Sequence, residues 1–201
     1  MIAIIDYGAG NIKSLQFALA RLNIDSCLTT DKQTIENCKA IILPGVGAFK
    51  DAMEAINDLN LGPVLKEEAG KGKPILGICL GMQLFYEASF EDGQWTGIGL
   101  LEGNVSRIDS SVKVPHIGWN TITKHGDSPL LNNISSNAYV YFVHSYAVNT
   151  YQQNSLIAST NYGGTIPAIV QQDNIIGMQF HPEKSGAVGL QLLQNFGEMI
   201  S

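Results

Sequence analysis

The sequence has little that would place it outside the interior of a cell. No apolar run approaches the roughly 18 residues that a membrane-spanning helix needs. The N-terminal stretch, Met1 to Asp6, meets an acidic side chain too early for a secretory signal peptide. The 12 basic residues are outnumbered by 18 acidic ones and are scattered along the chain, which argues against a nucleic-acid or anionic-membrane surface. We therefore expect a cytoplasmic protein that binds neither nucleic acid nor membrane.

Cysteine is also scarce. The three cysteines, Cys27, Cys38 and Cys79, are an odd number without metal-type spacing, so neither a disulfide framework nor a zinc site is indicated. No two of the four histidines have the close spacing of a metal-ligand pair. A glycine-rich stretch from Gly8 begins like a dinucleotide fingerprint, but Lys13 stands where the third glycine belongs. We expect no metal, no cofactor and at least one working thiol.

The length and the hydrophobic pattern predict one domain. A chain of 201 residues with 45% hydrophobic residues can form one sizeable core, so we expect a single domain over residues 1–201. In the first half, short apolar runs alternate with amphipathic stretches, which is typical of a parallel sheet covered on both faces by helices. The predicted strands are 2–6, one around residues 27–28, 40–43 and 74–78. Predicted helices lie at 11–22, after residue 28, in two segments before residue 73, and from the end of strand 74–78 through residue 88.

From Gly103 onward the pattern changes to short β-rich runs joined by turns. These runs are 105–108, 117–122, 139–143, 156–160, 168–171 and 175–180, and a final helix is predicted over 186–200. No linker separates the two halves, so we expect the second half to join the same sheet system. The predicted fold class is α/β, with a mostly parallel central sheet flanked by helices and an added antiparallel β-rich portion in the C-terminal half.

A candidate nucleophile lies where strand 74–78 ends. The segment 77–81 has the form G-x-C-x-G between an apolar strand and a helix, which is the nucleophile-elbow pattern with Cys79 in place of serine. The sharp turn strains the backbone of the nucleophile, and glycines on either side relieve the crowding. The helix start favours a thiolate through its free N–H groups and its dipole. Most free cysteines are simply small buried residues, so the motif needs a base nearby to carry a function.

His181 and Glu183 supply a candidate base and a carboxylate to orient it. They follow the predicted strand 175–180, and residues i and i+2 of an extended segment point to the same side. Pro182 favours that extended geometry. Without the elbow, this segment would be an ordinary surface loop. Donors for an oxyanion are available from the N–H of Leu80 and from the glycine-rich turn 44–47.

Several motifs, in one order along essentially the whole chain, resemble a known family. The elbow and the His-Pro-Glu segment are similar to those of class I glutamine amidotransferases, which implies their flavodoxin-like fold. More narrowly, four segments resemble the glutaminase subunits of imidazole glycerol phosphate synthases. These segments are Pro44 to Phe49, Pro115 to Asn120, His144 to Tyr146 and His181 to Ser185.

The resemblance implies that a triad of Cys79, His181 and Glu183 hydrolyses the side-chain amide of glutamine. The oxyanion would be stabilised at Val46, Gly47 and Leu80. Glutamine would be bound by Gly45, Gln83, Glu91, His144, Ser145 and Tyr146. In this family the Val46 peptide is thought to reorient on activation, and a glycine on each side makes such a flip physically plausible.

The resemblance also implies a partner. Ammonia would pass to a cyclase subunit, a (β/α)₈ barrel, which produces imidazole glycerol phosphate and an aminoimidazole carboxamide ribotide in histidine biosynthesis. The two subunits would form a heterodimer. The proposed interface residues are Asn11, Lys13, Trp119, Asn120 and Lys184. The alternative is a Trp119 in the core and a solvated Lys184.

Three other functions stay open. The same glutaminase chemistry could serve a synthase of anthranilate, aminodeoxychorismate or pyridoxal phosphate. The chain could be a non-catalytic binding subunit of the same fold, although such a role needs none of the three triad residues. A stand-alone cysteine hydrolase could carry a similar elbow, and activity without any partner would indicate it.

Overall fold

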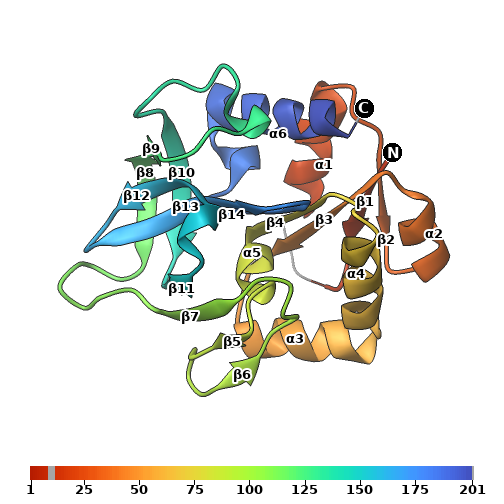
Figure 1. Cartoon of the computed structure of the whole chain (residues 1–201), viewed down its shortest axis with the longest axis horizontal. Helices are drawn as coiled ribbons and strands as arrows, with labels where there is room; N and C mark the ends of the chain where they lie inside the picture. The colour runs from red at the N-terminus through yellow and green to blue at the C-terminus, as the bar shows by residue number, and fades with distance from the viewer. Residues whose placement is uncertain (9–11, 201) are drawn as a thin grey trace.

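A large twisted sheet runs through the centre of the computed structural model, which describes residues 1–8 and 12–200 (Figure 1). Its strand order is β2-β1-β3-β4-β14-β13-β12-β9. The bounds are β1 (Ile2–Ile5), β2 (Ser26–Thr29), β3 (Ala40–Gly45), β4 (Ile75–Cys79), β9 (Thr123–Lys124), β12 (Leu156–Asn161), β13 (Thr165–Gln172) and β14 (Ile175–Met178). The pairs from β2 to β14 are parallel, and those from β14 to β9 are antiparallel. The order of the first four strands in space is that of flavodoxin-like sheets.

Helices cover both faces of this sheet (Figure 1). On one face lie α1 (Ile12–Arg21) and α6 (Gly186–Met199). On the other lie α2 (Lys32–Asn37), α3 (Phe49–Asp58), α4 (Leu61–Gly70) and the short α5 (Leu80–Leu84). Side chains of β1 alternate between the two cores, with Ile2 and Ile4 packing toward α1 and α6, and Ala3 and Ile5 packing toward α3 and α4. Burial on both faces explains why the first strands read as continuous apolar runs.

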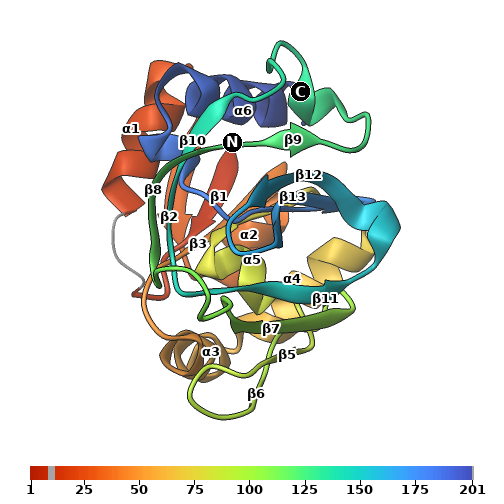
Figure 2. The ribbon, with the colours of Figure 1, turned by 90° about the vertical axis from the view of Figure 1, so that its left-hand side faces the viewer.

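Two smaller sheets lie beside the antiparallel edge, on the side that faces the viewer in Figure 2. One pairs β8 (His116–Thr121) with β10 (Tyr139–His144), and the other has the order β11-β7-β5-β6. The strands of the second are β5 (Ala88–Ser89), β6 (Trp95–Thr96), β7 (Gly103–Arg107) and β11 (Tyr146–Tyr151). Of the second half, β9, β12, β13 and β14 join the central sheet as expected, whereas these two smaller sheets are separate from it. Along β10 buried positions alternate with more accessible ones, so this ribbon needs cover on one face only.

The fold class is confirmed, and the element boundaries differ in places. The helix after the elbow ends at Leu84 rather than at Ala88, which pairs with Asn104 and Thr96 instead. The strands β5, β6, β9 and β11 were not predicted, since they are short or carry polar residues. The predicted helix start at Asn11 lies outside the described residues. No helix in the described ranges has the length and apolar character to cross a membrane.

Candidate active site

Cys79 lies at the junction of β4 and α5 with a strained backbone. Its φ is +55° and its ψ is −111°, a region that residues with a side chain rarely adopt. The flanking glycines are required by close packing. A Cβ on Gly81 would lie 1.8 Å from the carbonyl oxygen of Leu43, and one on Gly77 would lie 2.5 Å from the Phe85 ring. The elbow predicted from the sequence is thus formed, with the sulfur carried to the carboxyl edge of the sheet.

His181 and Glu183 contact each other below the same edge. The Nδ1 atom of His181 lies 2.9 Å from Oε1 of Glu183, and their side chains are 3% and 5% exposed. The backbone geometry differs from the prediction, because Pro182–Lys184 forms a 3₁₀ turn rather than an extended segment. Pro182 is the first residue of that turn, a position where its fixed φ and missing N–H are tolerated. The turn, and not strand alternation, brings the carboxylate to the imidazole.

Two residues that the sequence analysis did not identify hold this segment in place. Ser185 donates a hydrogen bond from Oγ to the carbonyl of His181 at 2.7 Å and accepts one from the N–H of Tyr141 at 2.9 Å. The N–H of His181 donates to the carbonyl of Tyr141 at 3.0 Å. The base is therefore fixed to β10 as well as to the end of β14. No sequence signal links Ser185 to Tyr141, because they are 44 residues apart.

The electrostatics favour a charged imidazole. Burial alone would lower the pKa of His181, but interactions with Cys79 and Glu183 outweigh burial and raise it. A protonated His181 in turn stabilises a thiolate on Cys79. The Nε2 atom of His181 is buried and has no hydrogen-bond partner among the described residues. Because Glu183 occupies Nδ1, this Nε2 is the nitrogen left to exchange protons with a bound molecule.

A pocket of about 330 Å³ opens above Cys79. It lies at the lower end of the range for small-molecule sites, about 300–1,000 Å³, which suits a single amino acid. The residues from the sequence analysis that line it are Val46, Gly47, Cys79, Leu80, Gln83, Glu91, His144, Ser145, Tyr146 and His181. The others are Pro115 and Val143. Gly45 is not among the lining residues. It pairs with Cys79 between β3 and β4, and a Cβ there would lie 2.6 Å from Oη of Tyr7.

Two predicted binding residues have partners within the protein. Glu91 accepts a hydrogen bond from the N–H of Phe49 at 2.8 Å, so the start of α3 holds this loop carboxylate against the pocket. Burial raises the pKa of Glu91. The side-chain nitrogen of Gln83 donates to the carbonyl of Tyr146 at 2.8 Å and to Oε1 of Gln179 at 3.0 Å. Both donor hydrogens of Gln83 are thus used inside the fold.

His144, which lines the pocket, belongs to a chain of hydrogen bonds. Its Nδ1 lies 2.9 Å from the carbonyl of Tyr146, and its Nε2 lies 3.0 Å from Nδ1 of His116. Nε2 of His116 lies 3.3 Å from the amide nitrogen of Asn120. Since a carbonyl only accepts, the chain runs in one direction with both imidazoles neutral. Burial lowers the pKa of each histidine to about 4, which agrees with this arrangement.

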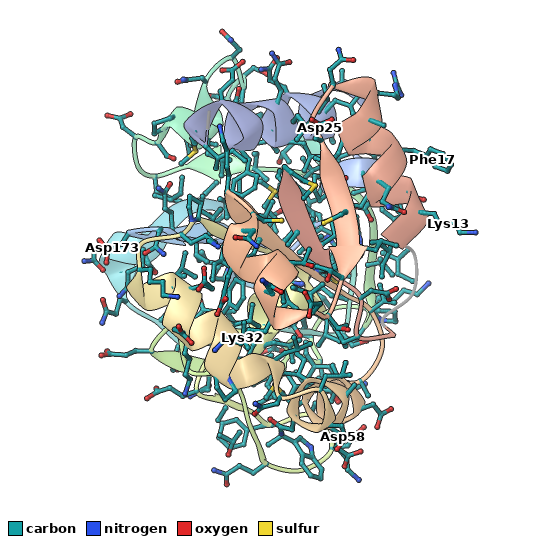
Figure 3. All side chains as sticks on the ribbon, turned by 90° about the vertical axis from the view of Figure 1, so that its right-hand side faces the viewer. Lys13, Phe17, Asp25, Lys32, Asp58 and Asp173 are labelled. Carbon is teal, nitrogen blue, oxygen red and sulfur yellow. The ribbon has the colours of Figure 1, made fainter. Side chains whose placement is uncertain are left out.

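The predicted interface residues are exposed to different extents. Lys13 lies on the outer side of α1 (Figure 3), and Lys184 is also exposed. Trp119 is 55% exposed and so is not a core residue. Asn120 is half-buried, with its amide bonded to the carbonyl of Asn161 as well as to His116. Asn11 lies outside the described residues.

Comparison with known proteins places the chain in a family. The family described as glutamine amidotransferase class-I matches residues 3–199 of this chain. The chain therefore belongs to the class I glutamine amidotransferases.

The particular relatives within that family share one name. Imidazole glycerol phosphate synthase subunit HisH of Oceanobacillus iheyensis is 64% identical over 200 residues, covering 100% of this chain and 100% of the relative. The subunit HisH of Caldanaerobacter subterraneus subsp. tengcongensis is 49% identical, covering 100% of this chain and 98% of the relative. Among solved structures, PurLQS of Thermotoga maritima has a TM-score of 0.79 at 19% identity, covering 100% of this chain and 98% of that chain, which shows a shared fold.

Proposed function

We propose that this chain is the glutaminase subunit of an imidazole glycerol phosphate synthase. It would hydrolyse glutamine to glutamate and ammonia, and a cyclase subunit would use the ammonia in the ring-forming step. The observation that supports it most is the meeting, in one pocket, of Cys79, the buried pair His181 and Glu183, and the predicted glutamine-binding side chains. The full-length relatives named HisH indicate the synthase. The ring-forming step, which is a lyase reaction, would belong to the cyclase subunit and not to this chain.

In the first half of the reaction, the Cys79 thiolate attacks the side-chain carbonyl carbon of glutamine. The developing oxyanion accepts a hydrogen bond from the N–H of Leu80, the first residue of α5, and from a donor at Val46 or Gly47. His181 then gives its Nε2 proton to the departing nitrogen. The C–N bond breaks, ammonia leaves, and a γ-glutamyl thioester remains on the sulfur.

In the second half, His181 is neutral and acts as a base. It removes a proton from a water molecule, which attacks the thioester carbonyl and releases glutamate and the thiolate. Glu183 supports both halves, because its carboxylate at 2.9 Å keeps a proton on Nδ1 and directs Nε2 toward the sulfur.

Glutamine itself would be held through its main-chain charges. Glu91 lines the pocket and offers a carboxylate for the α-ammonium group. Tyr146 and Ser145 contribute the other wall from the end of β10 and the beginning of β11. Gln83 would act with its carbonyl oxygen, because both of its donor hydrogens already have partners.

The partner surface would lie on the outer face of β8 and β10. Ile117, Trp119 and Tyr139 are large apolar residues exposed on this ribbon, an arrangement that soluble monomers rarely leave uncovered. The face is continuous with the pocket through Val143, which pairs with Ile117. Lys13 and Lys184 would contribute charged contacts at its rim. The cytoplasm is the proposed location, since the three thiols are free and suit a reducing compartment.

The test is glutamate release from glutamine by the purified chain, alone and with the cyclase subunit and its nucleotide. We expect strong activation by that partner, and loss of the activity in Cys79→Ser. Activity that persists in Cys79→Ser would contradict the proposed nucleophile. Full activity without any partner would instead indicate a stand-alone hydrolase.

Activation by a different synthase subunit would redirect the assignment to another pathway.

Trp119→Ala should weaken binding of the cyclase subunit by at least tenfold, as truncation of a buried aromatic contact does. The matched control is Leu59→Ala, which removes another exposed apolar side chain, at the end of α3. Equal affinity for the two variants, measured by calorimetry, would argue against the proposed surface.

Gly47 tests the oxyanion part of the proposal. Its φ is +103°, a conformation strained for any residue with a side chain, although a Cβ there would meet no atom within 4 Å. Gly47→Val should therefore impair activation by the partner more than it impairs partner binding. Equal losses of activation and binding would count against a role for this peptide in the oxyanion hole.

A further inference from the structure

Gln179 is a buried polar residue in an apolar setting. It follows β14, between Met178 and Phe180, and its side chain is 0% exposed. Its backbone N–H donates to the carbonyl of Ala168 at 2.9 Å, so the residue extends the pairing with β13. Placing an amide side chain here is costly unless its polar atoms have partners. Those partners therefore indicate what the amide does.

The orientation of the Gln179 amide is determined by its neighbours. Its Oε1 accepts from Nε2 of Gln83 at 3.0 Å, and its Nε2 lies 3.8 Å from the sulfur of Cys79. The Gln83 nitrogen also donates to the carbonyl of Tyr146, which can only accept. Gln83 must thus direct its NH₂ group at Gln179, and the side-chain oxygen of Gln179 must accept the hydrogen bond. The NH₂ group of Gln179 is left facing the sulfur.

The sulfur of Cys79 lies between an acceptor and a donor. On one side, the carbonyl of Val143 is 3.8 Å away and can receive a hydrogen bond from a thiol but not from a thiolate. On the other side, the NH₂ group of Gln179 can donate to a thiolate. A donor favours the charged form and an acceptor favours the neutral form. The amide opposes the carbonyl, and it fixes the direction in which the charged sulfur points.

We propose that Gln179 is a donor residue of the active site, whose amide stabilises the Cys79 thiolate and aims it at the substrate carbonyl. This inference rests on the proposed function in one respect, that Cys79 is the nucleophile. The ionisable groups around the sulfur are His181, with Glu183 behind it, His144 beside it, and Tyr7 under the sheet edge. Tyr7 donates its hydroxyl hydrogen to the carbonyl of Pro44, and His144 donates to the carbonyl of Tyr146. Neither neutral donor is directed at the sulfur, so the amide has a separate part.

The first test is the alkylation of Cys79 by iodoacetamide as a function of pH, in the full chain. Peptide mass spectrometry separates Cys79 from the other two cysteines. In Gln179→Met the donor is lost and the side-chain volume is kept. We expect the midpoint of the alkylation profile to rise by about one pH unit, which means about tenfold less thiolate below the midpoint. The limiting rate at high pH should rise about threefold, because access to the sulfur is the same and a thiolate of higher pKa is the stronger nucleophile.

The matched control is Gln172→Met, a half-buried glutamine at the end of β13, which should leave the profile unchanged. The second variant, Gln179→Glu, keeps an acceptor for Gln83 but directs a carboxylate oxygen at the sulfur. Its midpoint should rise further than that of Gln179→Met. Below the midpoint, glutamine hydrolysis by the complex should fall about threefold in kcat for Gln179→Met, because about tenfold less thiolate is partly offset by the higher nucleophilicity of the thiolate that remains.

An unchanged midpoint in both variants at Gln179 would overturn the proposal. So would a fall in the limiting alkylation rate without a change of midpoint, because that result describes disturbed packing. The readout is independent of the proposed function. If Cys79→Ser kept its glutaminase activity, the assignment of the nucleophile would fail, while the alkylation profile would still report whether the amide stabilises this thiolate.

Discussion

Replacing Gly81 by alanine should push the nucleophile away from the strand that supports it. Gly81 is the second residue of α5, and its Cα lies directly over the end of β3. The added Cβ would lie 1.8 Å from the carbonyl oxygen of Leu43. That oxygen belongs to the backbone of a central strand, so it has no freedom to rotate away. The helix start, with Cys79 and the N–H of Leu80, must therefore move.

The size of that movement follows from the distances. Ordinary van der Waals contact begins at 3.4 Å, so α5 would have to retreat by about 1.6 Å, the difference from 1.8 Å. Overpacking of this kind costs about 1–3 kcal/mol of unfolding free energy. A misplacement of about 1 Å at reacting atoms lowers the rate by about 100-fold. We expect Gly81→Ala to lose at least that factor in kcat/KM for glutamine.

The assay compares glutamine hydrolysis and thermal unfolding with a matched control. Gly70→Ala makes the same change at the exposed last residue of α4, where a Cβ would meet no atom within 4 Å. The control should keep full activity and lose no stability, since alanine has the higher helix propensity. A Gly81→Ala variant as active and as stable as Gly70→Ala would refute the close packing of the elbow on β3.

Three further changes test the charges of the site. Glu183→Gln should lower kcat/KM about 100-fold through loss of a charged hydrogen bond, and the lower pKa of His181 should move the alkaline limb of the pH–rate profile to lower pH. In Glu91→Gln the KM for glutamine should rise about tenfold with kcat nearly unchanged. In the wild type, the KM should rise as the pH falls toward the raised pKa of Glu91, because the carboxylate loses its charge. A KM that does not depend on pH would contradict the role of Glu91. Burial lowers the pKa of both His116 and His144 from 6.5 to about 4, so the unfolded chain binds more protons in that window and the unfolding free energy should fall as the pH drops through it. Denaturant titrations at several pH values should show that the unfolding free energy of His116→Phe falls less steeply as the pH drops. An unchanged pH dependence would mean that folding does not lower the pKa of His116.

Features of the protein that depend on neighbouring residues were predictable from the sequence, and features that depend on distant residues were not. The elbow was predictable because G-x-C-x-G between a strand and a helix expresses a local steric need, which the contacts of Gly77 and Gly81 bear out. The strands β1 and β3 were equally clear, since apolar runs buried on both faces are a local signal. The short strands β5, β6 and β9 were missed because two residues carry no periodicity.

The sequence by itself determined the fold class, the elbow and the neighbourhood of His181 with Glu183. Each depends on residues within a few positions of one another, where local steric contacts and the hydrophobic pattern act directly. Only the tertiary structure decided that a 3₁₀ turn brings Glu183 to His181, that Ser185 holds this turn to Tyr141, and that Gln179 faces the sulfur of Cys79. The last contact joins residues 100 positions apart. Contacts of that kind form only when β4 and β14 become neighbours in the sheet, and no local pattern encodes that pairing.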